Sequence, residues 1–270
     1  MARQLRRSAA CLNCGQLVAS RFCSECGQEN TDYRVSLGRL LGDLFEEVFQ
    51  IESRLWRSLW DLLRHPGRLT REYNAGRRVR YTTPLRLYLL ASVSYFFIGS
   101  LRPASDTIQV DLGKPGEMQQ QWHPSSKLER KLYDKVAEVQ RDPKAAARRA
   151  RQALSDYVPK VLAVLVPLFA LLTMLFFRRP KRFYVEHLVF ALHAHAAGFL
   201  ILLVGALIRS GWLSLLLLLG LAVWLSCAAR ELFGQSWARV SWKLILLGLV
   251  YSIFVAVGVT VALLVGVFAG

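Results

Sequence analysis

Four cysteines near the N-terminus form two copies of the motif C-x-x-C-G: Cys11 with Cys14, and Cys23 with Cys26. Each pair can grip a metal ion from one tight turn, because the following glycine tolerates a positive φ and lets backbone N–H groups face the sulfurs. Two disulfides, or iron in place of zinc, are the alternatives. Paired C-x-x-C-G motifs favour metal. Since no open ligand position is apparent, we predict a structural Zn²⁺ that folds a small ribbon.

A second group of chemically active side chains lies inside an apolar stretch: Glu186, His187, His193 and His195. Ionisable groups are costly inside a membrane, so a function is the default hypothesis for them. On an ideal helix Glu186 and His193 share a face but lie two turns apart, and His193 and His195 point in nearly opposite directions. No two of the four can therefore chelate one ion unaided.

Three roles stay open for this second group. It can form a pathway for protons or a polar substrate, or a metal or haem site that other helices complete. It can also be structural, with hydrogen bonds between helices to backbone carbonyls and hydroxyls such as those of Ser92, Ser94 or Thr173.

A cluster of arginines stands just before the first apolar run, and it includes Arg77, Arg78 and Arg80. In one interpretation these cations only anchor the chain on the cytosolic side of a membrane. In the other, their guanidinium groups contact phosphates or lipid headgroups, with Tyr73 and Tyr81 at the interface.

Charge is segregated along the chain. The sequence is 53% hydrophobic and 20% charged, with a net charge of +16, yet beyond Lys160 long apolar stretches are broken only by short basic segments. This segregation is typical of an integral membrane protein. The basic excess could also serve nucleic acid, but the arginines lie beside apolar segments, so we expect a lipid bilayer as partner and no nucleic acid.

The apolar stretches predict an all-α membrane bundle with five spans. Their limits are Leu85–Leu101, Val158–Phe177, Phe183–Ile208, Trp212–Ala229 and Trp242–Phe268. The first is short and contains Arg86, which must reach toward the interface. Basic loops stay in the cytosol, so five spans predict a cytosolic N-terminus, an extracytoplasmic C-terminus and an extracytoplasmic loop at 102–157. A charged helix is expected at 127–154 within that loop.

An amphipathic helix is expected between the cysteines and the first span, ending at His65-Pro66-Gly67. Its apolar side carries Trp56 and Trp60. The helix could lie in the membrane interface or pack on the protein's own helices.

The order of these motifs resembles a bacterial family of zinc-ribbon membrane proteins known only as a domain of unknown function (3667). The resemblance rests on the two C-x-x-C-G motifs, on Pro66-Gly67, Tyr73, Gly76-x-Arg78, Tyr81 and Pro84, and on Glu186-His187 followed by His193 and His195. It implies a bacterial inner-membrane location and carries no activity.

Three regions follow: a zinc ribbon at 1–33, an amphipathic and basic linker at 34–83, and a transmembrane domain at 84–270. No nucleotide-binding or hydrolase motif is present. We therefore favour a non-enzymatic role: the ribbon and amphipathic helix dock a cytosolic or membrane protein. A transporter or lipid-handling protein that uses the histidines and arginines is the alternative, and an intramembrane enzyme is the third. The sequence does not indicate the oligomeric state.

Overall fold

The computed structural model describes residues 9–30, 53–101, 125–208 and 211–268. These parts are mostly helical and contain no strand, only two isolated β-bridges near the cysteines. The helices are α2 (Ser53–Arg64), α3 (Arg68–Asn74), α4 (Pro84–Ser100), α5 (Lys127–Arg141), α6 (Pro143–Phe176), α7 (Tyr184–Ile208), α8 (Gly211–Phe233) and α9 (Trp237–Phe268). The expected all-α character is therefore found.

The chain divides into two compact units. Unit 1 comprises Met1–Gly99 and Val166–Tyr251, and unit 2 comprises Ser100–Leu165 and Ser252–Gly270. Helices α6 and α9 contribute to both units. The cysteines, the arginine cluster and the histidines of α7 all belong to unit 1.

In the described part of the chain, four helices are long and apolar enough to cross a membrane: α6, α7, α8 and α9. The prediction of five spans is therefore wrong in its count. The segment predicted as the first span is α4, whose 17 residues give a helix of about 26 Å at 1.5 Å per residue. That length falls short of a hydrocarbon core of about 30 Å, and Arg86 lies buried in its first turn.

The orientation rests on the basic loops, not on the length or hydropathy of the helices. A cytosolic N-terminus and an extracytoplasmic C-terminus therefore stay predictions.

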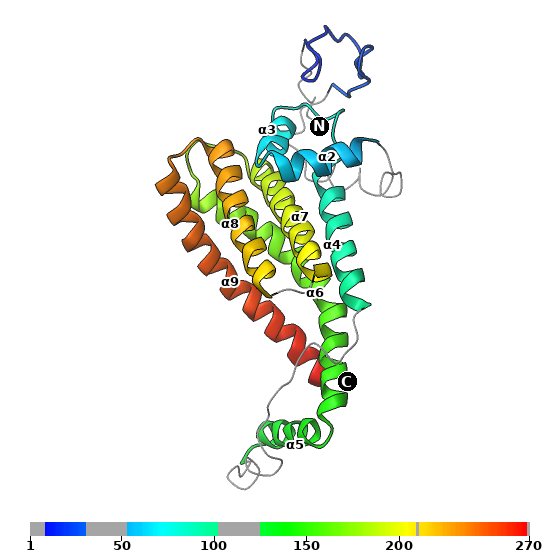
Figure 1. The fold of residues 1–270 in the computed structure, drawn as a ribbon, viewed down its shortest axis with the longest axis vertical. Coiled ribbons are helices and arrows are strands. Elements are labelled where there is room, and N and C mark those ends of the chain that lie inside the picture. The colour runs from blue at the N-terminus through cyan, green and yellow to red at the C-terminus, as the bar shows by residue number, and fades with distance from the viewer. Residues whose placement is uncertain (1–8, 31–52, 102–124, 209–210, 269–270) are drawn as a thin grey trace, which may run out of the picture. The chain divides into compact units, whose positions relative to one another are not determined.

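Helices α7 and α8 pack against each other and form the centre of unit 1 (Figure 1). Small side chains allow close packing: Ala191, Ala196 and Ala197 of α7 and Ala228 and Ala229 of α8 are buried. The short helix α3 packs against both α7 and α8, and α2 packs against α3 and α7. Figure 1 shows α2 and α3 at the end of unit 1 where α7 begins and α8 ends.

Helix α2 is amphipathic, as expected, but its tryptophans do not form the packed face. Leu55, Ser58 and Leu62 are buried, whereas Trp56 and Trp60 are exposed. Polar contacts fix the packed face: Trp224 donates its indole N–H to the Leu62 carbonyl at 3.0 Å, and the Thr82 backbone N–H donates to the Ser58 hydroxyl at 2.9 Å. The residues of the predicted helix before Ser53 lie outside the described part.

The helix predicted at 127–154 is divided between two helices in unit 2, α5 and α6. A capping box at Ser126 and Glu129 starts α5, and the helix ends at Arg141. Pro143 then begins α6, since a proline ring fits the first turn of a helix but not its interior. The rest of the predicted helix therefore continues into the span of α6. Helices α9 and α6 also approach closely in unit 2. Gly258 permits this because a Cβ at that position would lie 2.5 Å from Cγ1 of Val161.

Gly67 lets the chain turn from α2 into α3 against α8. Its φ is 84°, and a Cβ there would lie 2.8 Å from the carbonyl oxygen of Ala228 and 2.9 Å from Cβ of Glu231. The Gly67→Ala variant should lose about 2 kcal/mol or more of stability through backbone strain and the forced shift of α3. Thermal unfolding in detergent measures this. Gly220→Ala, in α8 with no atom near the added Cβ, is the control and should unfold near the wild-type temperature.

Candidate functional site

The two C-x-x-C-G motifs fold as two similar knuckles. Gly15 and Gly27 have φ values of 81° and 71°, the positive values expected at these positions. Each donates its backbone N–H to the first cysteine of its motif, Gly15 to the Cys11 carbonyl at 2.8 Å and Gly27 to the Cys23 carbonyl at 2.9 Å. The repeated turn brings both cysteines of each motif to the same side.

The four cysteines lie close together and could hold a metal ion. Their sulfur atoms are all within 4.8 Å of one another. The Cys11 and Cys26 sulfurs lie 3.6 Å apart, as do those of Cys14 and Cys23. A tetrahedral site with metal–sulfur bonds of about 2.3 Å needs sulfurs separated by about 3.8 Å. All four are free thiols, so this donor set fits zinc.

Backbone groups favour the thiolate form at the first ligand. Burial raises the pKa of Cys11, but the backbone N–H groups of Cys14 and Asn13 outweigh it and lower that pKa to about 7. The thiolate is the form of cysteine that binds metal.

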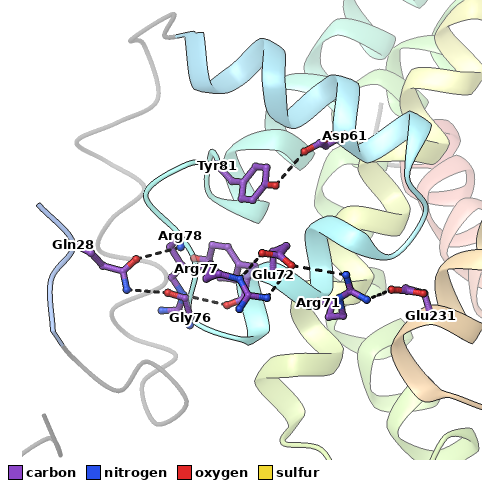
Figure 2. A network of polar contacts seen from close by, with 10 residues as sticks. Gln28, Asp61, Arg71, Glu72, Gly76, Arg77, Arg78, Tyr81 and Glu231 are labelled. Carbon is purple, nitrogen blue, oxygen red and sulfur yellow. Dashed lines mark hydrogen bonds and ion pairs between the residues drawn. The ribbon is translucent and has the colours of Figure 1, made fainter. Parts of the chain in front are cut away.

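One side chain attaches the second knuckle to the loop after α3. The Gln28 amide donates to the Gly76 carbonyl at 2.9 Å, and its oxygen accepts the Arg78 backbone N–H at 3.3 Å (Figure 2). Gln28 is buried. Leu12 of the first knuckle covers Gly76 so closely that a Cβ there would lie 2.7 Å from Cδ1 of Leu12. Both knuckles therefore contact this loop.

The loop and α3 form a network of ion pairs (Figure 2). The Arg77 guanidinium donates to both carboxylate oxygens of Glu72. Arg71 forms an ion pair with Glu231 of α8. Arg78 lies over the ring of Tyr73, 4.6 Å from its centroid. The network ties α3 to its own loop on one side and to α8 on the other.

Helix α3 also contacts the predicted intramembrane group. Thr70 Oγ1 and His193 Nδ1 share a buried hydrogen bond of 2.9 Å, and the Tyr73 ring meets the His193 ring edge-on. The Asn74 side-chain amide donates to the Glu186 carbonyl at 3.5 Å. Helix α3 thus lies along α7 from Glu186 to His193.

The other predicted residues each contact a different neighbour. His187 bonds to Thr173 of α6 at 3.2 Å and stacks on Phe233. His195 bonds to the Ala191 carbonyl and to the Tyr251 hydroxyl of α9, both at 2.8 Å. Glu186 pairs with Arg182. The structure therefore does not gather Glu186, His187, His193 and His195 at one point.

This arrangement agrees best with the structural alternative. Thr173 is one of the hydroxyls named as a candidate partner, whereas Ser92 bonds within its own helix, to the Leu89 carbonyl at 3.1 Å. The hydrogen bonds from α7 reach α3, α6 and α9, so the three histidines join helices together.

The arginines predicted to contact headgroups differ from one another. The side chains of Arg77 and Arg78 are engaged with Glu72 and Tyr73, and Arg80 is exposed. The headgroup contact stays a prediction.

Sequence reasoning missed Gln28, Thr70 and Glu231. Gln28 had a signal: it follows Cys26-Gly27 as Gln16 follows Cys14-Gly15, so the repeat marks it as a knuckle position. Thr70 and Glu231 had none, because their partners are 123 and 160 residues away in the chain.

The comparisons with known proteins add one finding. A family model described as "Protein of unknown function (DUF3667)" matches residues 52–96. The match covers α2, α3 and most of α4, while the knuckles and the histidines lie outside it. No curated protein and no solved structure matches the chain.

The Glu72–Arg77 pair predicts an acid-dependent loss of stability. The hydrogen bond from Arg77 lowers the Glu72 pKa below its usual 4.5, although burial opposes the shift. The pair therefore stabilises the fold fully above pH 4.5, and that contribution is lost as the pH falls through the folded-state pKa. The unfolding temperature of Glu72→Gln should lie below that of the wild type at neutral pH, and the two should converge on acidification. A constant difference from pH 7 to pH 3 would contradict this role.

Proposed function

We propose that this chain is a membrane-anchored interaction module, in which a zinc-held pair of knuckles presents a docking surface to a protein partner. The observation that carries the proposal is the attachment of the knuckles through Gln28 to the loop at Gly76. Helix α3, which precedes this loop, is itself bonded to α7 and α8. An anchor of this kind holds a small domain in a fixed place without burying its outer surface.

Apolar side chains on the knuckles support a docking role. Leu17 is 77% exposed and Phe22 is 51% exposed. Leu12, in contrast, lies against Gly76 of the loop. A domain of this size buries little on its own, and exposed apolar groups on a metal-held scaffold suit a protein interface.

The charge of a neighbouring linker supports a cytosolic position for the knuckles. Helix α3 contacts the start of α7 and the end of α8, so the knuckles belong to the same end of unit 1 as the basic linker 178–182. Basic linkers stay in the cytosol of the bacterial inner membrane. The cytosol also keeps thiols reduced and available for zinc.

The pathway alternative has less support. Its four residues contact α3, α6, α9 and Arg182 separately. One feature favours it: Nε2 of His193 is buried and has no hydrogen-bond partner within the described part of the chain. Full activity of a His193→Ala variant in any flux assay would argue against this alternative.

Zinc content tests the metal centre. Purified wild-type protein should carry about one zinc per chain, because one four-thiolate site takes one ion. The double variant Cys11→Ser with Cys14→Ser should lose that zinc. Cys227→Ser is the matched control, since Cys227 lies in α8 outside the cluster, and it should keep the metal. A metal-free wild type with its four N-terminal sulfurs oxidised would reject the centre.

Crosslinking in cells tests the docking surface. A photoreactive side chain at position 17 or 22 should crosslink to a specific protein, and the crosslink should disappear in the Cys11→Ser/Cys14→Ser background while the spans still insert. Phe22→Asp should also reduce partner recovery but keep zinc, which separates contact from folding. Recovery that is unchanged in both variants would remove the proposal.

A further inference from the structure

Two adjoining hollows lie where α6 ends, α7 begins and α9 begins. The first has a volume of about 640 Å³ and lies between the end of α6 and the start of α7. The second has a volume of about 490 Å³ and lies between the linker after α6 and the start of α9. Arg178 lines both hollows. They belong to unit 1 and use none of the cysteines or the arginines of the α3 network.

The first hollow has an apolar wall that ends in a cation. Leu171 and Leu175 of α6 are 54% and 52% exposed, and Phe183 at the start of α7 is 59% exposed. Arg178 follows the end of α6 at Phe176, and its Nε donates to the Leu175 carbonyl at 3.2 Å, so its side chain lies beside Leu175. A molecule in this hollow therefore meets hydrocarbon along α6 and a guanidinium at its end.

The second hollow is basic. Its lining includes Arg179, Arg239 and Lys243 as well as Arg178, and no acidic residue lines either hollow. Lys243 donates to the Gln235 side chain at 3.0 Å, and Gln235 donates to the Arg179 carbonyl at 2.8 Å. Across the described ranges, no carboxylate forms an ion pair with any of these four cations. Their charge is available for an anion.

We propose that the two hollows form one site for a diacyl phospholipid with an anionic headgroup. The phosphate binds between Arg178 and Arg179, and an acyl chain lies against Leu171 and Leu175. A free phosphate would leave the apolar hollow unused. A zwitterionic lipid would add its own cation to a cluster that has no acid to receive it. Basic pockets between membrane helices at the headgroup level are suited to anionic lipids.

A binding experiment on the full chain in neutral detergent tests this site. The probes are dioleoylphosphatidylglycerol, dioleoylphosphatidylcholine and glycerol 3-phosphate, and native mass spectrometry measures the bound copies at increasing concentration. We expect saturable binding of phosphatidylglycerol at much lower concentration than phosphatidylcholine, and no binding of glycerol phosphate. Equal binding of the two lipids would overturn the proposal, and so would equal binding of glycerol phosphate.

Charge variants locate the site. Arg178→Gln with Arg179→Gln should weaken phosphatidylglycerol binding roughly thirtyfold, the combined effect of two cations near a charged lipid surface. Arg178→Lys with Arg179→Lys should recover most of the affinity, which shows that the loss is not misfolding. The control Arg130→Gln with Arg148→Gln removes the same charge from exposed positions in unit 2 and should bind as the wild type does. Equal losses in the test and control pairs would overturn the proposal.

A steric variant tests the apolar part separately. Leu175→Trp should fill the first hollow and weaken phosphatidylglycerol binding while all four cations remain. Wild-type affinity in this variant would mean that the acyl chain does not lie against α6, and it would overturn the assignment of that hollow to the lipid.

Discussion

Hydrogen bonds from the histidines that lie among apolar helices govern the arrangement of unit 1. An unpaired polar group in a hydrocarbon environment costs several kcal/mol, so the histidines of α7 restrict which helices can be its neighbours. His193 binds Thr70 of α3, His187 binds Thr173 of α6, and His195 binds Tyr251 of α9. Apolar packing alone would allow helices to slide or rotate. These three contacts fix their order and depth.

Helix α3 carries this restraint to the knuckles. It has seven residues, too few to be stable alone, so its position depends on its contacts. Its side chains contact His193 by a hydrogen bond and Glu231 by an ion pair. The loop that follows it accepts a hydrogen bond from Gln28. Unfolding of the knuckles would free the loop from Gln28, while the contacts of α3 with α7 and α8 would persist. The knuckles and the helical bundle can therefore fail separately.

Local chemistry made part of this structure predictable. Two features depend only on neighbours in the chain: the positive φ of the glycine after each C-x-x-C pair, and the break at Pro66-Gly67. The long apolar helices depend only on composition. The first span was overpredicted because Arg86 was expected to reach toward the interface from a short helix, whereas Arg86 is buried in the first turn of the 17-residue α4. The partners of His187, His193 and His195 were beyond reach, apart from the suggestion of Thr173, because they depend on how distant helices pack.

The two basic regions of unit 1 differ in one physical respect, and this separates their roles. In the α3 region the described acids neutralise arginines: Glu72 pairs with Arg77, and Glu231 with Arg71. These cations already have partners, so they hold the fold together. Among the described residues no acid forms an ion pair with Arg178 or Arg239, and the nearby Glu186 is already paired with Arg182. Because like charges repel, the ends of α6 and α9 would be destabilised unless an anion joined them. A headgroup phosphate would supply it, so the lipid would complete this end of the bundle as Glu72 and Glu231 complete α3.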